Sequence, residues 1–438
     1  MKRNRILTVV ISLLCLGVAS VVLAADGDID TTYGTNGLSR TIESGLGAAV
    51  DIAVQADDKS VVLSAKNTDF AVLRFNTDGS RDTTFGTGGE VLINFATSSS
   101  QPSDAPQAIV IQPDGKILVA GSTSPAGNPD FAIARLNSDG TLDASFGNGG
   151  LVTTDFSGNT DLAYDIIVQS DNKIVVVGAA AVGNHANYKF AVARYNDNGS
   201  LDNSFANGGT RIISWGFGFN VATGVAQQAD GKLVVVGVAK TPNYDFAIAR
   251  LRVNGKIDHT FGSNGRVSTT FSSPPVDDSQ AKSVAIASDG KIVVGGGPYV
   301  PWGHYYVARY MSDGSLDSSF ATGGQSDTAV ASYSASPTTI SIANGQIILG
   351  GYSQSSDACA LTRYDVTLVR YNDDGTLDTN FGNSGIALYN PYPATISYCV
   401  SGMTVRGMAL QSDGKIVVAG GDYLSTNFVG LIAARFYN

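Results

Sequence analysis

A repeating unit runs along almost the whole chain and limits its possible folds more than any other feature. The segment 108–121, Ala-Ile-Val-Ile-Gln-Pro-Asp-Gly-Lys-Ile-Leu-Val-Ala-Gly, returns as residues 165–178 with Asp-Asn-Lys at its centre. Five further copies surround the residue that follows the turn: Lys59, Lys232, Lys291, Gln346 and Lys415. Self-similarity at a fixed spacing is the mark of a repeat architecture.

A second segment follows every copy except the last. In the second unit it is residues 131–147, Phe-Ala-Ile-Ala-Arg-Leu-Asn-Ser-Asp-Gly-Thr-Leu-Asp-Ala-Ser-Phe-Gly. Each unit contains four short runs rich in Val, Ile and aromatic residues, which in the third unit are 151–156, 163–169, 173–179 and 190–196. The Asp-Gly-Lys turns supply the positive-φ residues of tight hairpins. Seven units of about 59 residues with four antiparallel strands each predict an all-β, seven-bladed β-propeller.

The two ends of the chain carry complementary halves of the second segment. Residues 26–34, Asp-Gly-Asp-Ile-Asp-Thr-Thr-Tyr-Gly, match its tail, and residues 433–438, Ala-Ala-Arg-Phe-Tyr-Asn, match its front. A ring whose ends share one blade explains this arrangement, whereas an open array with capping repeats does not. We therefore expect a single propeller domain over residues 25–438.

The first 24 residues differ from the rest of the chain. Residues 1–5 are basic, residues 6–24 are predominantly apolar, and Val-Leu-Ala at 22–24 offers small or β-branched side chains at the positions that a signal peptidase reads. We predict that residues 1–24 are a signal peptide and that the mature protein is secreted or periplasmic, with no membrane span after cleavage. A retained anchor is the alternative, since about 20 apolar residues can cross a bilayer.

Composition limits the partners. The 51 glycines and the charged fraction of 15% are typical of a turn-rich, strand-rich globular protein. The net charge is -10, and removal of Lys2, Arg3 and Arg5 makes it more negative. An acidic surface disfavours nucleic acids and anionic membranes. The sequence does not set an oligomeric state, and a monomer is the default expectation.

The repeat also resembles a known family. The runs Asp-Gly-Lys-Ile-Val-Val-Gly and Phe-Ala-x-Ala-Arg-Tyr-Asn-x-Asp-Gly-x-Leu-Asp-x-x-Phe-Gly are similar to the delta-60 repeat family of bacterial exported proteins. The resemblance covers residues 26–438 and implies a β-propeller with an extracellular or envelope location, but no activity and no catalytic residues. The units depart from the pattern at Arg252 and Asn254, and at residues 344–346, Asn-Gly-Gln.

Connections in a four-stranded meander alternate between the two faces of the disc. The Asp-Gly-Lys turns and the linkers of the second segment therefore share one face, here called the regular face, and are nearly uniform. The remaining connections share the opposite face, here called the variable face, and differ in length and composition. Binding residues usually lie on variable loops held by a rigid scaffold, so we expect function on the variable face.

Several aromatic residues lie beside Gly and Pro in the connections of the variable face. The candidate ligand-binding residues are Trp215, Phe217, Phe219, Trp302, His304, Tyr389 and Tyr392. Aromatic side chains in such loops can stack on a sugar or an apolar ligand. The alternative is that they fill gaps between blades.

Two cysteines lie in connections of the same face. Cys359 belongs to the sixth unit and Cys399 to the seventh, so neighbouring blades could bring them together. An oxidising compartment favours a disulfide. We predict a bond that staples the two longest loops.

Charged residues of the repeat are predicted to form a structural ring. One arginine per unit (Arg74, Arg135, Arg194, Arg250, Arg309, Arg370 and Arg435) and one linker aspartate per unit (Asp30, Asp82, Asp143, Asp202, Asp258, Asp317 and Asp378) imply one pair per blade. The linker Asn137-x-Asp139-Gly-x-Leu-Asp143 also places oxygens as in part of a calcium loop, but it lacks the closing bidentate acid. A turn with local backbone bonds is the favoured interpretation. No metal or other cofactor is predicted, with calcium as the alternative.

Enzyme motifs are scarce. The three histidines, His185, His259 and His304, lie in different units, and the chain has no nucleophile elbow, dinucleotide fingerprint, P-loop or zincin motif. His304 is retained as a catalytic candidate. Glycosidase chemistry with carboxylates alone stays open, and the acids on or near the variable face are Asp104, Asp155, Asp277 and Asp278.

These observations favour a non-enzymatic binding or scaffold module whose variable face meets a glycan, a protein or a surface polymer. A propeller hydrolase or lyase acting on a polysaccharide or lactone is the first alternative. A calcium-stabilised structural propeller is the second.

Overall fold

The computed structural model shows an all-β chain. It describes residues 24–95, 104–124, 127–156, 158–183, 187–216, 218–240, 243–271, 278–299, 302–331, 333–356, 362–392, 401–424 and 427–438. These residues form 28 strands in five four-stranded sheets and one eight-stranded sheet, and they contain no helix. In this part of the chain there is accordingly no helix that could span a membrane. The predicted all-β chain of four-stranded units is confirmed.

The first three sheets follow the chain in order. One contains β2 (Leu46–Val54), β3 (Ser60–Lys66), β4 (Asp69–Phe75) and β5 (Glu90–Ile93). The next contains β6 (Ala105–Ile111), β7 (Ile117–Thr123), β8 (Asp130–Leu136) and β9 (Leu151–Thr154). The third contains β10 (Asp161–Val168), β11 (Ile174–Ala181), β12 (Tyr188–Tyr195) and β13 (Thr210–Ile213). We call these groups blades 1, 2 and 3.

Blades 4 and 5 repeat the pattern. Blade 4 contains β14 (Asn220–Gln227), β15 (Leu233–Lys240), β16 (Tyr244–Leu251) and β17 (Arg266–Thr269). Blade 5 contains β18 (Ser279–Ile286), β19 (Ile292–Pro298), β20 (His304–Tyr310) and β21 (Gln325–Ala329).

The eight-stranded sheet consists of two further groups of four. Blade 6 contains β22 (Ser334–Ala343), β23 (Gln346–Ser356), β24 (Thr362–Tyr371) and β25 (Ile386–Tyr389). Blade 7 contains β26 (Ser401–Leu410), β27 (Ile416–Leu424), β28 (Asn427–Phe436) and, from the other end of the chain, β1 (Leu38–Thr41). A short parallel pairing of β24 with β26, Arg363 with Ser401 and Tyr364 with Gly402, joins the two groups into one sheet.

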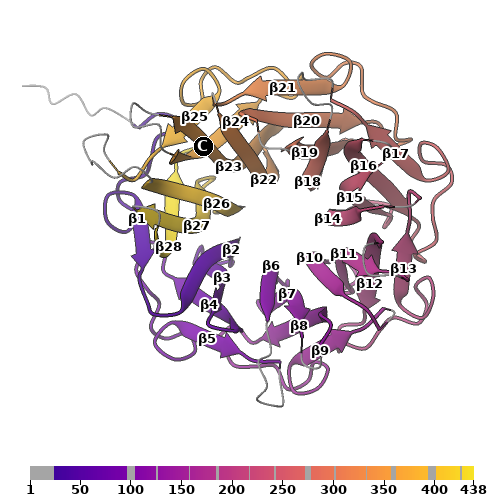
Figure 1. Ribbon diagram of the computed structural model, residues 1–438. Coiled ribbons are helices and arrows are strands. Elements are labelled where there is room, and N and C mark those ends of the chain that lie inside the picture. Colours follow the sequence, from indigo (N-terminus) through magenta and orange to yellow (C-terminus); the bar gives the residue numbers. More distant parts are fainter. Residues whose placement is uncertain are drawn as a thin grey trace, which may run out of the picture.

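The blades surround a common axis, with the first strand of each blade nearest the centre (Figure 1). Strand β1 pairs with β28 from Leu38–Ala434 to Thr41–Leu431, so the two ends of the chain lie in one sheet. Side chains of blade 1 such as Ile52 pack in one hydrophobic cluster with side chains of blade 7 such as Val417.

The core lies between adjacent blades. Each hydrophobic cluster combines neighbours, for example Val61 and Leu63 of blade 1 with Ile117 and Val119 of blade 2. Strands buried on both faces need no polar alternation, and every residue of β11 is buried. In blade 3 the inner strand β10 bulges between Ala163 and Asp165, next to Gly178 on β11. A Cβ on Gly178 would lie 1.9 Å from the Leu162 carbonyl oxygen, so the close approach of the two strands requires glycine.

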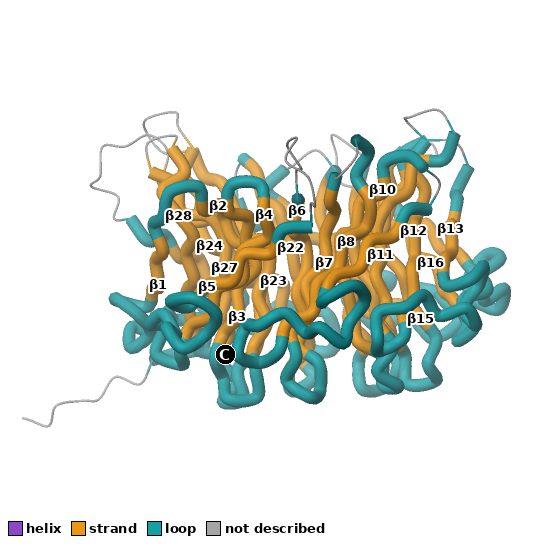
Figure 2. Tube along the Cα trace, turned by 90° about the horizontal axis from the view of Figure 1, so that it is seen from below, coloured by secondary structure: helices purple, strands orange, loops and turns teal. Residues whose placement is uncertain are grey.

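Seen from the side, the strands run between two layers of connections (Figure 2). The connections β2–β3 and β4–β5, with their equivalents, lie on the regular face. The connections β3–β4 and β5–β6, with their equivalents, lie on the variable face. Alternate connections of an antiparallel meander must end on opposite sides, because consecutive strands reverse direction.

Candidate functional site

The regular face is held by buried arginine–aspartate pairs. Arg135, on the third strand of blade 2, donates from Nε to Asp143 Oδ2 at 2.8 Å, and both side chains are buried. All seven repeat arginines lie 2.8–2.9 Å from their linker aspartates. The seventh pair, Arg435 with Asp30, joins the two ends of the chain.

The same arginines reach into the neighbouring blade. Arg135 donates from Nη1 to the carbonyl oxygen of Asp197, in the linker of blade 3, and its guanidinium lies 4.6 Å from the Phe146 ring centroid. Arg74 makes the equivalent bond to the Ser138 carbonyl oxygen. Each such arginine therefore connects its own linker to the next one, which is a structural role. We call the buried arginine–aspartate pair, together with the bond to the next linker, a clamp.

A lysine of the Asp-Gly-Lys turn, or of its equivalent, completes six of the seven pairs. Lys116 Nζ lies 3.1 Å from Asp143 Oδ2. Burial raises the pKa of Asp143, but hydrogen bonds from Ser145 and Lys116 and the charge of Arg135 outweigh burial and hold this pKa well below its usual range. In blade 6 the amide of Gln346 takes the place of the lysine and donates to Asp378.

The linker oxygens are used within their own turns. Asp139 Oδ1 accepts hydrogen bonds from the backbone N–H and the hydroxyl of Thr141, at 2.9 and 2.7 Å. The hydroxyl of Thr141 also accepts from Asn137 Nδ2. These contacts are those of a hydrogen-bonded turn, the favoured interpretation of the sequence.

Trp215 occupies a packing position that recurs in other blades. Its ring lies 4.4 Å from that of Phe190 and packs against a buried cluster. The equivalent aromatic pairs are Phe70–Phe95, Phe131–Phe156 and Phe246–Phe271, at 4.8–5.1 Å. The contacts favour gap filling over ligand binding. An aromatic residue recurs two positions after the outer strand in these four blades, a sequence signal that was not used in the prediction.

Tyr389 and Tyr392 lie between blades 6 and 7. Tyr389 packs on Phe436 at 5.9 Å. The hydroxyl of Tyr392 donates to Asp422 Oδ1 at 2.7 Å, and the Arg40 guanidinium lies 5.4 Å from its ring centroid. Burial, together with the Asp422 carboxylate, raises the pKa of Tyr392 to about 12. These contacts are also structural. Phe217, Cys359 and Cys399 lie outside the described residues.

Trp302 and His304 lie near the rim of blade 5. Trp302 is 43% exposed. His304 Nδ1 lies 2.6 Å from Asp327 Oδ1 on the outer strand β21. This pair joins the third and fourth strands of blade 5 and so lies away from the inner strand β18. Trp302 remains an exposed aromatic residue on the variable face.

An aromatic patch covers blades 3 to 5 on the variable face. It consists of Tyr164, Tyr188, Phe219, Tyr244 and Tyr299, all partly exposed. Phe219 contacts Tyr188 and Tyr244 edge-on at 5.8 and 6.4 Å. Tyr244 and Tyr299 are stacked at 3.9 Å, with an interplanar angle of 4°. Of the residues in this patch, only Phe219 was predicted from the sequence as a binding candidate, because the tyrosines lie in or beside ordinary strand segments.

The inner strands carry charged residues beside their bulges. Asp51 accepts backbone hydrogen bonds from Ile52 and from Ile109 of blade 2. Asp165 makes the same contacts with Ile166 and with Val225 of blade 4. Burial raises the pKa of both carboxyl groups to about 7, although the backbone N–H groups act in the opposite direction.

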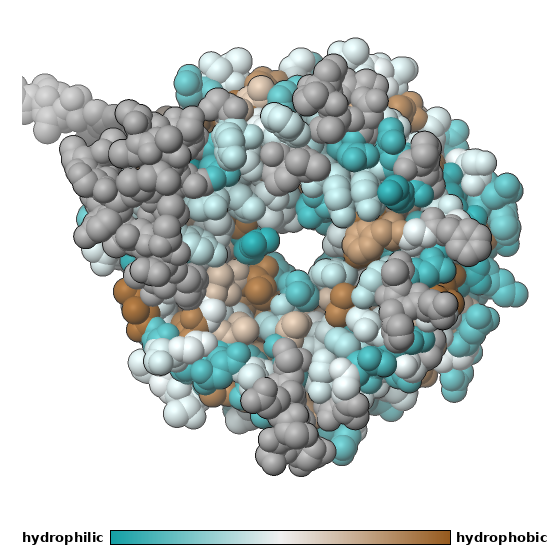
Figure 3. Space-filling view, viewed as in Figure 1, coloured by the Kyte–Doolittle hydropathy of each residue, from teal (hydrophilic) through white to brown (hydrophobic). Residues whose placement is uncertain are grey.

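Basic residues occupy other inner strands. Burial lowers the pKa of Lys282, on β18, to about 8, and the charge of Arg406, on β26, adds to the effect. An opening is visible at the axis of the molecule (Figure 3). The inner strands thus place acids on blades 1 and 3, and bases on blades 5 and 7.

These opposite pKa shifts predict that the protein is most stable near pH 5. The pKa is lowered for six ring aspartates: Asp30, Asp82, Asp143, Asp202, Asp258 and Asp317. They contribute stability above their ordinary pKa of 3.8 and lose it as the pH falls. Asp51 and Asp165, with raised pKa values, lose stability as the pH rises from 4 through 7. We expect these two carboxyl groups to cause a loss on the order of 5 kcal/mol between pH 5 and pH 8 in urea unfolding. A double Asp51→Asn, Asp165→Asn variant should lose most of this slope, with the remainder due to Asp161, whose pKa burial also raises to about 7. A flat or rising wild-type profile would contradict the prediction.

A family model described as a domain of unknown function (DUF5122) beta-propeller matches seven segments that together cover more than half of the chain: 55–85, 112–146, 169–205, 228–261, 287–320, 342–381 and 411–435. The chain belongs to the DUF5122 β-propeller family. A DUF5122 segment such as 112–146 runs from the lysine turn through the arginine to the linker aspartate and the phenylalanine under the guanidinium. The last segment stops at Arg435, because the rest of its linker is at the other end of the chain.

Several solved structures are similar to this chain at low sequence identity. A streptogramin B lyase is 12% identical, with a TM-score of 0.50, over 92% of this chain and 97% of that one. A protein of unknown function from Dyadobacter fermentans DSM 18053 is 10% identical, with a TM-score of 0.46, over 92% and 99%. An intramolecular trans-sialidase from Ruminococcus gnavus is 11% identical, with a TM-score of 0.42, over 94% and 98%. No curated protein matches the sequence.

Proposed function

We propose that the protein is an exported, closed propeller of seven delta-60-type blades, and that its variable face binds a glycan or another surface polymer. The aromatic patch of blades 3 to 5 carries this proposal. Four of its rings, those of Tyr188, Phe219, Tyr244 and Tyr299, form a continuous series of contacts across three blades, and all are partly exposed.

The patch has the chemistry of a sugar platform. Partly exposed tyrosines combine an apolar ring face with a hydroxyl that can donate or accept a hydrogen bond. Lys240 Nζ lies 5.3 Å from the Tyr244 ring centroid and adds a donor to the rim. A pyranose ring presents an apolar C–H face with hydroxyls at its edge, which complements this arrangement.

The patch is also held in place before a ligand arrives. Asp278 accepts a hydrogen bond on its side chain from the Tyr244 backbone N–H at 2.9 Å, and on its carbonyl oxygen from the Tyr299 backbone N–H at 3.0 Å. One residue thus fixes both stacked tyrosines. A rigid site loses less conformational entropy on binding, which supports a binding function.

Replacing Tyr244 or Tyr299 with alanine is expected to weaken binding to an array of immobilised polysaccharides about two- to tenfold. Loss of one aromatic stacking partner removes about 0.5–1.5 kcal/mol, and 1.4 kcal/mol corresponds to a factor of about ten. Tyr333→Ala is the matched control, because Tyr333 is 62% exposed and lies outside the patch. Binding that survives in the patch variants but disappears in Trp302→Ala would move the site to the rim of blade 5.

A hydrolase or lyase is the second candidate function. The observation that favours it is the presence of two inner-strand carboxyl groups with pKa values raised to about 7, a range suited to proton transfer at neutral pH. Their backbone hydrogen bonds across blades equally suit a structural role. Turnover of the bound polysaccharide that is lost in Asp165→Asn and retained in Tyr244→Ala would support the enzyme.

A further inference from the structure

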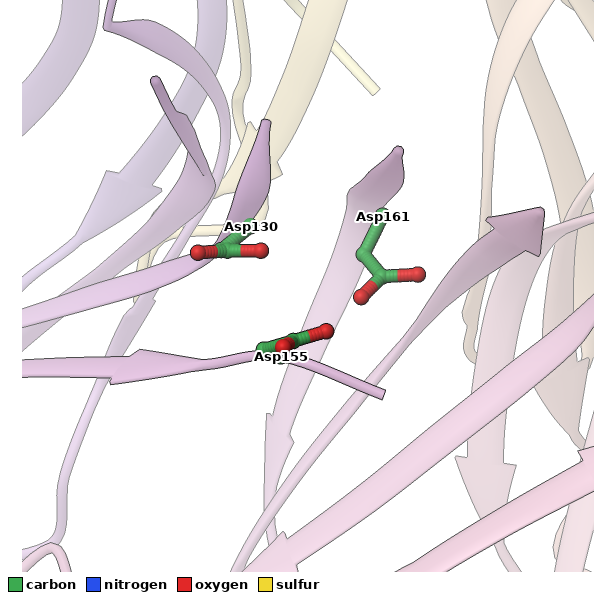
Figure 4. Close-up of side chains that lie close together, drawn as sticks. All are labelled: Asp130, Asp155 and Asp161. Atoms are coloured by element: carbon green, nitrogen blue, oxygen red, sulfur yellow. The ribbon is translucent and has the colours of Figure 1, made fainter. Parts of the chain in front are cut away.

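Three carboxylates converge on the variable face between blades 2 and 3. Asp130 is the first residue of β8, Asp155 follows β9, and Asp161 is the first residue of β10. One ligand oxygen from each lies within 4.8 Å of the other two (Figure 4). Asp130 is half-buried, Asp155 is exposed and Asp161 is fully buried.

One oxygen of the buried carboxylate lacks a hydrogen-bond partner. Asp161 Oδ2 accepts a hydrogen bond from the Phe156 backbone N–H at 2.7 Å. Asp161 Oδ1 is buried and has no partner among the described residues. Leaving a buried charged oxygen without a donor is costly, so this atom points to a ligand that the protein itself does not provide.

The preceding blade boundary shows how the same position is satisfied elsewhere. Asp104 directly precedes the Ala105–Ser122 pair of blade 2, just as Asp161 directly precedes the Leu162–Ala179 pair of blade 3. The two aspartates therefore occupy equivalent positions. Asp104 Oδ2 accepts from the Phe95 backbone N–H, and its Oδ1 accepts from the Thr123 hydroxyl at 2.6 Å. The residue paired with Asp161 is Ala180, which has no hydroxyl to donate.

The following blade boundary replaces the acids with a base. Lys189 stands near the start of β12, where it pairs with Ala180, and Asn220 is the first residue of β14. Lys189 is buried and its Nζ donates to the Gly216 carbonyl oxygen. At that boundary the chain supplies its own cation, whereas the boundary of blades 2 and 3 carries three carboxylates.

We propose that Asp130, Asp155 and Asp161 bind a Ca²⁺ ion that links blade 2 to blade 3. The donors are all carboxylate oxygens, which hard cations prefer. Two ligands on opposite sides of Ca²⁺ are separated by about 4.6–5.2 Å, but by only about 4.0–4.2 Å around Mg²⁺. The three oxygens, all within 4.8 Å of one another, fit within the coordination sphere of Ca²⁺, and the comparison with MgCl₂ below tests the choice of ion.

The electrostatics of the cluster agree with this assignment. Burial raises the pKa of Asp161 to about 7, and the charges of Asp155 and Asp130 raise it further. A divalent cation among the three groups would replace their mutual repulsion with attraction. The site is independent of the aromatic patch, so failure of the glycan proposal leaves it standing.

The test begins with the purified protein, treated with a chelator and then titrated with CaCl₂ in a calorimeter. We expect one site per chain, and a thermal midpoint that rises with Ca²⁺ concentration, since a ligand of the native state shifts unfolding by mass action. Asp161→Asn and Asp155→Asn should weaken Ca²⁺ binding at least 100-fold. Asp104→Asn, the matched control in blade 2, should leave the affinity within about twofold.

A further variant distinguishes loss of the Ca²⁺ site from loss of folding. Asp130→Lys reproduces the basic residue of the next boundary, and it should fold, lose Ca²⁺ binding and become insensitive to chelator. Three results would overturn the proposal: no heat or midpoint shift in the parent protein, Ca²⁺ binding that persists in both Asp155→Asn and Asp130→Lys, or binding that is lost equally in Asp104→Asn. Binding of MgCl₂ as tight as that of CaCl₂ would overturn the choice of ion.

Discussion

Replacing Arg135 with leucine is expected to lower the free energy of unfolding by about 3–5 kcal/mol, because removing one partner of a buried ion pair leaves the other charge uncompensated. Arg135 is 2% exposed, and its loss would leave Asp143 buried with only Lys116 as a counter-charge. The substitution also removes the bond to the Asp197 carbonyl oxygen and the stacking on Phe146. Urea unfolding followed by circular dichroism would measure the change.

The chain offers a control of the same chemistry at the surface. The Arg252 side chain is 50% exposed and lies 3.6 Å from Asp258. Arg252→Leu should cost less than about 1 kcal/mol, because the Arg252 side chain is solvent-exposed and the buried Asp258 keeps Arg250 as its partner. The double variant Arg135→Leu, Asp143→Leu should recover part of the loss, because no buried charge is then left alone. Equal costs for Arg135→Leu and Arg252→Leu would show that the buried clamp contributes no more than a surface ion pair.

Replacing Asp30 with alanine should destabilise the protein as much as replacing Asp143, within about 1 kcal/mol, and each should cost about 3–5 kcal/mol. Asp30 is fully buried and lies 2.8 Å from Arg435 and 3.3 Å from Lys415. Asp30 and Arg435 are 405 positions apart in sequence, yet they repeat the geometry of Asp143 and Arg135, which are 8 apart. The comparison therefore measures whether the joint between the chain ends is as firm as an ordinary clamp.

Asp28→Ala is the control for the joint, since Asp28 is exposed and its side chain accepts a hydrogen bond only from the nearby Ala25 backbone N–H. It should change stability by less than about 0.5 kcal/mol. An effect of Asp30→Ala that is more than about 2 kcal/mol smaller than that of Asp143→Ala would mean that the ends separate before the blades unfold. Unfolding monitored at several wavelengths would then show two transitions in the parent protein.

The strands could be predicted closely because their signals are local. For the third unit the predicted runs 151–156, 163–169, 173–179 and 190–196 differ from the observed strands β9 to β12 by at most two residues at each end. The grouping differed, because β9 pairs in the sheet of blade 2 and blade 3 is completed by β13 instead. Hairpin turns and β-branched runs specify each strand without reference to the rest of the chain. The short β24–β26 pairing that merges blades 6 and 7 has no such signal, because it depends on where two loops meet.

The candidate site was harder to predict. Trp215 was an obvious aromatic residue beside glycine, yet its ring fills the position that Phe95, Phe156 and Phe271 fill elsewhere. Tyr244 and Tyr299 belong to different blades, and only the packing of blade 4 against blade 5 stacks their rings.

The sequence by itself determined the all-β chain, the four-stranded unit and the recurrence of one arginine and one aspartate in each unit, because each of these is written into a local pattern repeated along the chain. Only the tertiary structure separated Asp161 from Asp104. Both are aspartates at the entrance of an inner strand, and they differ in whether Thr123 or Ala180 stands opposite. An unsatisfied buried oxygen is a property of the surroundings of a side chain, and those surroundings exist only once the blades have packed together.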